Sequence, residues 1–306
     1  MARTHTATVA IVAALLVLAP TGAATLAAAS TANAPGSTPA TTLDSPALDV
    51  APIDPEPTSV HPTDADQRHL GQRGTVHRNV DQRNVDQTDS DAADAEPPGD
   101  EPVLLVHGFA DTGYTPWWEE MTDNLADAGY EHGEVFVLNL GAVPGSTVDS
   151  PEDYAAHVCD AIQTVHERTD SDEVDVVAHS MGGLDARYCI EKLDGASDVD
   201  DLVTLGTPHQ GTYVAYLAYI TPGGRDMVPG SDFLQDLNDG QLAASVEYTA
   251  VWSDWDELIN HDEYAKLPTE ERASVPNAKN VFVNNKFHAQ LVWDDDVFDA
   301  WIDRLD

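Results

Sequence analysis

The chain has 306 residues, with 54 Asp and Glu against 14 Lys and Arg, so its formal net charge at pH 7 is −40. This charge argues against nucleic acids and anionic membranes as partners, because both are polyanions and would be repelled. We therefore expect neutral or apolar partners. Asp outnumbers Glu and lysine is rare, which is typical of a salt-adapted (halophilic) protein whose self-repulsion is screened by high ionic strength. An ordinary acidic secreted protein is the alternative.

Residues 1–34 have the pattern of a secretory signal peptide. Arg3 precedes an apolar run over residues 7–19, and small residues at 32–34 are typical of a cleavage site. The run stops at Pro20 and is short for a membrane span, but an alanine-rich extension to Ala29 leaves an uncleaved N-terminal anchor as the alternative. We expect a secreted, extracellular protein, or one held at the cell surface by this segment.

Residues 35–100 predict a disordered acidic linker or pro-region. The segment is rich in Thr, Asp, Gln, Pro and Ala, is nearly free of aromatic residues and shows no sustained apolar period. Within it, the sequence RNVDQ at 78–82 repeats at once at 83–87. One short polar duplication is too little to build a repeat fold.

Residues 101–306 predict a single α/β domain with a mostly parallel sheet. Short apolar runs that suit strands buried on both faces alternate with segments whose apolar residues recur every three or four positions. Such alternation over about 200 residues favours one parallel sheet covered by helices. The expected strands are 102–106, 135–140, 174–178, 202–205, 248–252 and 280–283, and the clearest helices are 153–167, 184–193 and 297–305.

The strand at 174–178 runs directly into His179-Ser180-Met181-Gly182-Gly183, and helix-forming residues follow. A strand, a sharp turn with serine at its apex, and a helix together form the geometry of a nucleophile elbow. The turn requires small residues two positions either side of the serine, which Ala178 and Gly182 provide. The alternative is a serine that only caps a helix. We predict that Ser180 is a catalytic nucleophile.

A second motif supports this prediction. His107-Gly108-Phe109 ends an earlier buried strand, where a backbone N–H can face the nucleophile. The backbone N–H groups of Phe109 and Met181 are therefore the candidate oxyanion hole. A strand terminus with a turn glycine is the alternative reading of the same residues.

A serine hydroxyl needs a base that is itself oriented by a carboxylate, and in this fold the chain order is serine, acid, histidine. Of the histidines after Ser180, His288 follows the last expected strand and precedes the last helix, and we predict that it is the base. His209 directly follows a strand end and suits the wall of the site, and His261 lies in a polar acidic stretch. The candidate acids after Trp252 are Asp254, Asp256, Glu257 and Asp262.

The sequence AHSMGG at 178–183 closely resembles the elbow of the small extracellular triacylglycerol lipases of bacteria, the class 2 lipases of the α/β-hydrolase superfamily. These proteins also carry alanine where many hydrolases have glycine. Further segments are similar to the oxyanion strand and loop, the strand after the elbow, the segment before the acid strand and the acid-bearing stretch of that family. They are residues 103–109, 203–211, 227–238 and 248–256.

The resemblance implies an α/β-hydrolase fold and ester hydrolysis through an acyl-enzyme on Ser180. It also implies His288 as the proton shuttle and, because the family's acid falls three residues after a serine, Asp256 as the orienting carboxylate, with Asp254 second. The usual glycine before the histidine is here Phe287, a departure from the family pattern. The likeness covers residues 101–306 in pieces and says nothing of residues 1–100.

For two aromatic segments and for the pair of cysteines, the sequence leaves two structural interpretations open. The uncharged run Tyr213–Ile220 suits either a wall of an acyl pocket or an ordinary buried helix, and Trp117-Trp118 have the same ambiguity. Cys159 and Cys189 lie on helices that flank the elbow strand on one side of the sheet, so they form either a disulfide or two buried thiols.

The sequence shows no Cys/His metal spacing and no glycine-rich phosphate loop, so we expect no cofactor. The substrate predicted is an apolar ester or lipid. A thioesterase or polyester depolymerase with the same triad is the alternative within enzymes. A non-catalytic hydrolase-like binding protein at the cell surface is the alternative outside them.

Overall fold

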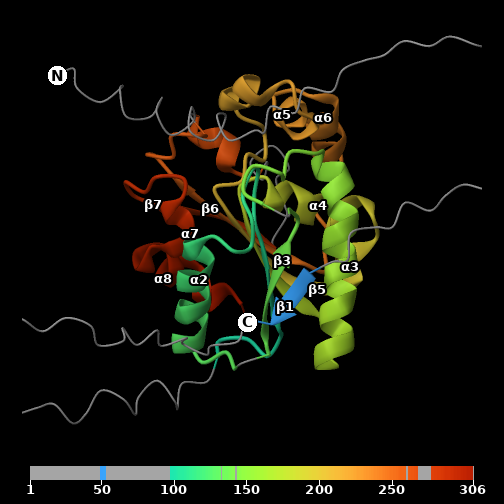
Figure 1. Cartoon of the computed structure of the whole chain (residues 1–306), viewed down its shortest axis with the longest axis vertical. Coiled ribbons are helices and arrows are strands. Elements are labelled where there is room, and N and C mark those ends of the chain that lie inside the picture. Colours follow the sequence, from blue (N-terminus) through green and yellow to red (C-terminus); the bar gives the residue numbers. More distant parts are fainter. Residues whose placement is uncertain are drawn as a thin grey trace, which may run out of the picture.

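A central, mostly parallel sheet organises the protein in the computed structural model (Figure 1), which describes residues 49–52, 97–131, 133–141, 143–259, 261–267 and 277–305. Within these residues the strand order is β1-β3-β2-β4-β5-β6-β7, and only β1 runs antiparallel to its neighbour. The strands are β1 (Asp49–Pro52), β2 (Val103–Val106), β3 (Val135–Asn139), β4 (Val174–His179), β5 (Val199–Leu205), β6 (Glu247–Ser253) and β7 (Ala278–Val283).

Helices cover both faces of this sheet, as Figure 1 shows. The helices α3 (Pro151–Thr169) and α4 (Gly182–Lys192) pack on one face, and α2 (Pro116–Asp127), α7 (Gln290–Trp293) and α8 (Asp295–Trp301) pack on the other. Alternate residues of one strand therefore enter different cores: Leu104 packs toward α3 and α4, whereas Leu105 packs toward α2 and α8. This two-sided burial explains the unbroken apolar run of β2.

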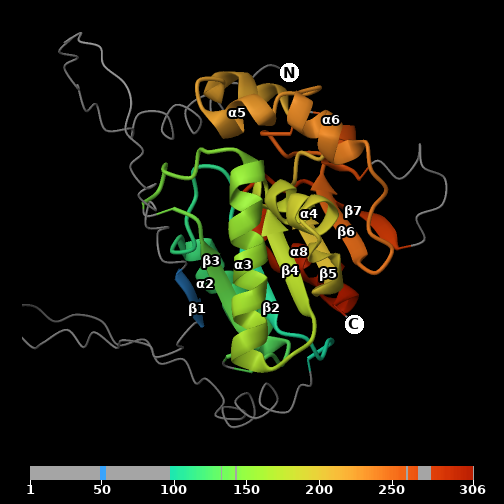
Figure 2. The ribbon, with the colours of Figure 1, turned by 90° about the vertical axis from the view of Figure 1, so that its right-hand side faces the viewer.

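A third group of short helices lies beyond the carboxyl ends of the strands, above the sheet in Figure 2. This group contains η3 (Tyr213–Ala218), α5 (Pro222–Asp226) and α6 (Asp232–Asn238). The remaining helical turns of the described residues are η2 (Gly195–Ser197), η4 (Asp262–Ala265) and η5 (Ile302–Arg304). Buried side chains of α6, among them Phe233 and Leu237, join Met181 and Leu184 in a small separate core. This group therefore packs over the residues that follow β4.

The strand order places a topological switch between β2 and β4. The chain continues from β2 to β3 on one side, and from β4 to β5, β6 and β7 on the other. Loops leave the carboxyl ends of β2 and β4 in opposite directions, and such a point opens a crevice where ligands bind in parallel α/β folds. The loop after β2 holds Phe109 and the turn after β4 holds Ser180.

The predicted elements agree with the structure apart from their ends and a few omissions. The strand β5 begins at Val199, three residues before the predicted start, because the polar pair Asp200-Asp201 interrupts its apolar run. The helix α2 was not predicted. The segment Tyr213–Ile220 is not a buried helix: η3 leaves Tyr216, Leu217 and Ile220 mostly exposed.

The strand β1 departs from the prediction for residues 35–100, which assigned that whole range to a disordered linker. Residues 49–52 pair with Phe136–Asn139 at the edge of the sheet. Their sequence, Asp-Val-Ala-Pro, is too short for an apolar period to be read from it. The remainder of the predicted linker up to residue 96, and the predicted signal peptide at 1–34, lie outside the described residues. No helix among the described residues has the length and apolarity that crossing a membrane requires.

The helices that flank β4 are joined covalently. Cys159 of α3 and Cys189 of α4 form a disulfide across 30 residues of sequence, with Cα atoms 5.7 Å apart. Of the two readings that the sequence left open, the structure has the disulfide. The loop that it closes contains β4 and the whole turn around Ser180.

We expect reduction of this disulfide to lower the free energy of unfolding by about 3–4 kcal/mol, because a closed loop of this size restricts the unfolded chain. Chemical denaturation with and without dithiothreitol measures the difference. A Cys159→Ala/Cys189→Ala variant is the control and should not respond to the reductant. Equal stability of the oxidised and reduced parent would contradict the prediction.

Candidate active site

Ser180 sits at a strained turn between β4 and α4. Its φ is +56°, a left-handed conformation that non-glycine residues adopt only when the surroundings enforce it. The backbone N–H of Ser180 donates to the carbonyl of Leu205 at 2.9 Å, which ties the turn to the end of β5. The side chain of Ser180 is only partly buried, although both neighbours are buried. The fold therefore presents this hydroxyl outward.

The glycines around the turn leave no room for side chains. A Cβ at Gly182 would lie 2.5 Å from the carbonyl oxygen of His107, and a Cβ at Gly108 would lie 2.7 Å from Cβ of Ser180. The loop after β2 and the elbow are therefore in backbone contact, as the sequence motif requires. Because Gly108 lies against the backbone nitrogen of Met181, the N–H groups of Phe109 and Met181 belong to the same small region.

His107 fixes the loop that carries Phe109. Its Nε2 accepts from the backbone N–H of Leu140 at 2.9 Å, so the proton is on Nδ1, which lies 3.1 Å from the carbonyl of Gly108. Ala110 then takes a φ of +58° and donates to the carbonyl of Thr147 at 2.8 Å. Burial is the main cause that lowers the pKa of His107, so the ring stays neutral in this role.

Asp256 and His288 form a hydrogen-bonded pair. Nδ1 of His288 lies 2.8 Å from Oδ2 and 3.0 Å from Oδ1 of Asp256, and both side chains are buried. Asp256 is itself held, because Oδ1 accepts from the backbone N–H groups of Leu258 and Ile259, each at 3.0 Å. A buried carboxylate that is fixed in this way orients the imidazole through Nδ1 and leaves Nε2 available to accept a proton.

This pair stands beside the elbow. The rings of His288 and His179 have centroids 4.6 Å apart, and Nε2 of His179 is 3.2 Å from the carbonyl of His288. On the other side, a Cβ at Gly206 would lie 3.0 Å from Oδ2 of Asp256 and 3.2 Å from Nδ1 of His288. Gly206 follows Leu205, which binds the N–H of Ser180, so the carboxyl ends of β4, β5, β6 and β7 converge on one place.

Comparison with known proteins gives the family. Residues 100–297 match the family described as lipase (class 2), a match that covers more than half of the chain. The chain belongs to the class 2 lipase family. The match includes Ser180, Asp256 and His288 and the loop after β2.

Curated relatives of this class 2 lipase-family chain include triacylglycerol lipases from Pseudarthrobacter phenanthrenivorans and Burkholderia plantarii. Each is 30% identical over 118 residues, which is 37% of this chain and 35% or 31% of the relative. The chain thus spans about a third of the length of the curated relatives it matches.

Solved structures show the same α/β-hydrolase fold. The mature lipase BlEst2 of Bacillus licheniformis superposes with a TM-score of 0.55 at 18% identity, covering 70% of this chain and 96% of that chain. Lipase B of Aspergillus fumigatus gives a TM-score of 0.51 at 20% identity, over 69% of this chain and 54% of that chain. At these identities the likeness concerns the fold alone.

Three of the other candidate acids and bases lie elsewhere in the structure. Asp254 is exposed and accepts from the backbone N–H of Asn285 at 2.9 Å. His209 is buried between Thr204, 3.0 Å from its Nε2, and Arg187, 3.3 Å from its Nδ1. His261 is exposed and packs against Tyr213 and Tyr264. None of these three side chains reaches the Asp256–His288 pair.

Several residues support the site in roles that the sequence did not predict, among them Glu257, which was predicted only as a candidate acid. Glu257 accepts from the backbone N–H of His288 at 3.0 Å, His179 packs against the imidazole, and Gly206 provides the space beneath the pair. A glycine directly after a strand was the only signal for Gly206. The structure also shows where Trp117 and Trp118 lie. Both indole N–H groups donate to Oδ2 of Asp111, at 3.1 and 3.2 Å, and Trp118 is a core residue.

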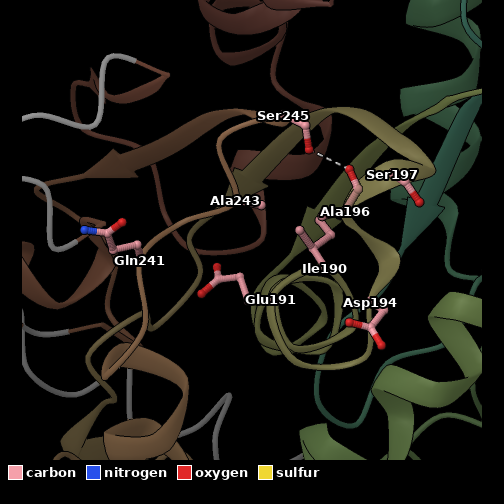
Figure 3. Close-up of a pocket in the computed structure, with 8 residues that line it drawn as sticks. All are labelled: Ile190, Glu191, Asp194, Ala196, Ser197, Gln241, Ala243 and Ser245. Atoms are coloured by element: carbon pink, nitrogen blue, oxygen red, sulfur yellow. Dashed lines mark hydrogen bonds between the residues drawn. The ribbon is translucent and has the colours of Figure 1, made fainter.

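One surface hollow among the described residues lies away from this site. It has a volume of about 470 Å³ and lies where the end of α4 meets the loop before β6, between residues such as Glu191 and Gln241 (Figure 3). Ser245 Oγ donates to the carbonyl of Ala196 across it, at 2.8 Å. Glu191 is already engaged by Arg187 at 2.8 Å, so its carboxylate is not a free group that faces the hollow.

Two opposing effects set the pKa of His288. Burial, the largest, disfavours the imidazolium, but the charge of Asp256, its hydrogen bond to Nδ1 and the charges of Glu257 and Asp111 act against burial, and the pKa is raised. The neighbouring His179 has no such carboxylate, and burial holds its pKa well below the usual value. Of these two packed rings, His288 is thus the one that can carry a proton.

We expect Asp256→Asn to lower the pKa of His288, because burial then acts without the compensating carboxylate. NMR titration of the imidazole resonances measures the shift. Asp254→Asn removes a carboxylate two positions away that does not touch the ring, and should leave the pKa of His288 unchanged. A pKa that does not respond to Asp256→Asn would contradict the assigned pairing.

Proposed function

We propose that the protein is a serine hydrolase that cleaves carboxylic esters, a lipase or carboxylesterase, through an acyl-enzyme on Ser180. The observation that carries the proposal is the buried Asp256–His288 pair beside a strained, outward-facing serine. Family membership supports the same reaction class. The relatives' names supply triacylglycerols as the substrate class to test first.

The proposed mechanism follows from the hydrogen bonds of the site. Asp256 holds a proton on Nδ1 of His288, so Nε2 is the free base that accepts the proton of the Ser180 hydroxyl during attack on the ester carbonyl. The N–H groups of Phe109 and Met181 stabilise the oxyanion that forms. The imidazolium then donates its proton to the departing alkoxide. Water, activated by the same nitrogen, attacks the acyl group and releases the acid.

Exposed aromatic residues next to the pair favour an apolar substrate. Trp255 precedes Asp256 and Phe287 precedes His288, and their rings pack with centroids 5.9 Å apart while both remain about half exposed. The residue that replaces the family's glycine, Phe287, is therefore part of an apolar rim. A contiguous exposed apolar surface beside reactive groups is a common mark of a lipid or ligand site.

A second apolar surface continues above the elbow. The rings of Tyr213, Tyr216 and Tyr219 stack in sequence, with centroids 6.5 and 6.1 Å apart, and Leu217 and Ile220 are 60% and 87% exposed. This exposed run leads into α5, whose Gly223 contacts the sulfur of Met181. The arrangement suits the acyl-wall reading of Tyr213–Ile220.

The disulfide and the acidic composition bear on where the protein works. The Cys159–Cys189 disulfide would persist outside the reducing cytoplasm, in agreement with the signal-like pattern of residues 1–34. The charge of −40 would be tolerated best at high ionic strength, where repulsion among surface carboxylates is screened. We therefore propose a secreted enzyme that works in strong salt.

We expect Ser180→Ala to lower the hydrolysis of nitrophenyl esters at least about a thousandfold, a loss typical of removing a triad nucleophile. The assay uses the full chain in high salt with acyl chains from short to long, so its profile also separates lipase from esterase. Ser197→Ala changes an exposed serine far from the site and should retain activity. A folded parent as inactive as Ser180→Ala on every ester would refute the proposed function.

We expect Leu217→Ser/Ile220→Ser to reduce hydrolysis of emulsified triglyceride about tenfold, because losing apolar burial worth about 1.4 kcal/mol weakens adsorption by that factor. Hydrolysis of a soluble short-chain ester should be unchanged, because neither side chain belongs to the triad. Leu193→Ser, an exposed leucine at the opposite end of α4, is the matched control. Equal losses on both substrates would show that the segment does not act through apolar contact.

A further inference from the structure

Five carboxylates gather at the amino ends of three neighbouring strands, the edge of the sheet opposite the triad. Carboxylate oxygens of Asp175, Asp200 and Asp201 all lie within 4.8 Å of one another, and so do those of Glu101, Glu173 and Asp200. Asp200 belongs to both groups. Together they extend from the protein interior to its surface, because Asp175 and Asp201 are buried and the other three are partly exposed.

The parallel register of β2, β4 and β5 brings these residues together. Asp175 pairs in register with Val103, near the start of β2 and close to Glu101. The next strand along the sheet is β5, and its bulge opposite Val174–Val176 is where Asp200 and Asp201 lie. Parallel strands align their amino ends at one edge, so the cluster is a product of the fold and not of a single acidic loop.

Asp175 is the unusual member of the group. Its side chain has no solvent exposure, and its Oδ1 accepts from the backbone N–H of Asp201 at 3.2 Å. Its Oδ2 is buried and has no hydrogen-bond partner among the described residues. A buried carboxylate oxygen without a partner is costly, and a residue such as valine would fill a strand position here at no such cost.

The surroundings of Asp175 are narrow on one side and acidic on the other. A Cβ at Gly99 would lie 3.4 Å from Oδ2 of Asp175 and 3.3 Å from the hydroxyl of Tyr130, so the backbone of Gly99 closes this side. The other side faces Asp200 and Asp201. The carboxylate of Asp175 thus lies in a partly enclosed space that is lined by oxygen atoms.

We propose that Asp175, Asp200 and Asp201 bind one hard divalent cation of the Ca²⁺ type, with Glu101 and Glu173 adding negative charge at its outer side. Calcium–oxygen distances of about 2.3–2.6 Å allow two ligand oxygens to be up to about 4.6–5.2 Å apart across the ion, which accommodates the observed spacing. Magnesium gives up its waters reluctantly and is usually held by only one or two carboxylates, so a group of three carboxylates suits calcium better.

The competing arrangement is a proton in place of the cation. Burial, followed by the charges of Asp201, Glu101 and Asp200, raises the pKa of Asp175 to about 9 when no cation is present. A protonated Asp175 would relieve the same repulsion. The two arrangements differ in their response to calcium and to an amide at position 175, which mimics the protonated acid.

The test is thermal unfolding of the full chain after removal of divalent ions by a chelator, with CaCl₂ or MgCl₂ added at constant high NaCl. The salt screens diffuse binding by the many surface carboxylates. The variants are Asp175→Asn and, in case this buried change impairs folding, Asp200→Asn at the partly exposed ligand. Glu120→Gln removes one exposed carboxylate from α2 and is the matched control.

We expect calcium at about one hundred times its Kd to raise Tm by about 5–10 °C in the parent and in Glu120→Gln. The rise should saturate, be smaller with magnesium, and be lost in Asp175→Asn and Asp200→Asn. Without calcium, Asp175→Asn should be as stable as the parent. A parent that ignores calcium, which is the outcome of the proton arrangement, would overturn the proposal, and so would variants that respond as fully as the parent. Calorimetric titration should give one calcium per chain.

Discussion

The backbone contact between the loop after β2 and the turn after β4 is the constraint on which the site depends. Ser180 is held at a positive φ because its N–H binds Leu205 on one side and Gly108 fits against its Cβ on the other, while Gly182 fits against the backbone of His107. The strain of such a residue persists only where the surrounding structure over-determines it. Here the surrounding structure is the sheet itself, since the contacts come from three adjacent parallel strands.

The same strands explain why distant residues meet. The acid and the base follow β6 and β7. Two backbone N–H groups hold Asp256, and His288 is held by its backbone N–H, which donates to Glu257 of the loop after β6, and by its carbonyl, which faces His179. Because the base and the nucleophile are placed by separate loops, their alignment rests on the packing around Gly206 and on the ring contact between His179 and His288. Ser180, Asp256 and His288 therefore lie at the carboxyl ends of the strands, while the acidic cluster around Asp175 lies at the amino ends of strands in the same sheet.

The elements most readily predicted were those whose sequence follows a local rule. The buried strands β2 and β4 are continuous apolar runs, and the small residues around Ser180 reflect a turn that admits nothing larger. The strand β1 could not be found this way, because its four residues depend on pairing with the edge of β3 and not on an apolar pattern. The acid posed a different difficulty. In a chain with 54 acidic residues a nearby carboxylate carries little information, so the sequence ranked Asp256 above Asp254 only through the family resemblance. In the structure Asp256 contacts His288, whereas Asp254 binds the backbone of Asn285. The start of β5 was missed for a related reason, because Asp200 and Asp201 look like loop residues and the burial of Asp201 follows from tertiary contact.

The disulfide between α3 and α4 has a consequence for how the molecule opens. These two helices and β4 between them form one closed covalent ring, and the nucleophile lies on that ring. The disulfide ties the two helices to each other, so motion of one away from the sheet is restrained by the other, and both pack into the core on that face. We therefore expect the elbow to exchange slowly with solvent, whereas the half-exposed apolar rim around Trp255 and Phe287 exchanges faster.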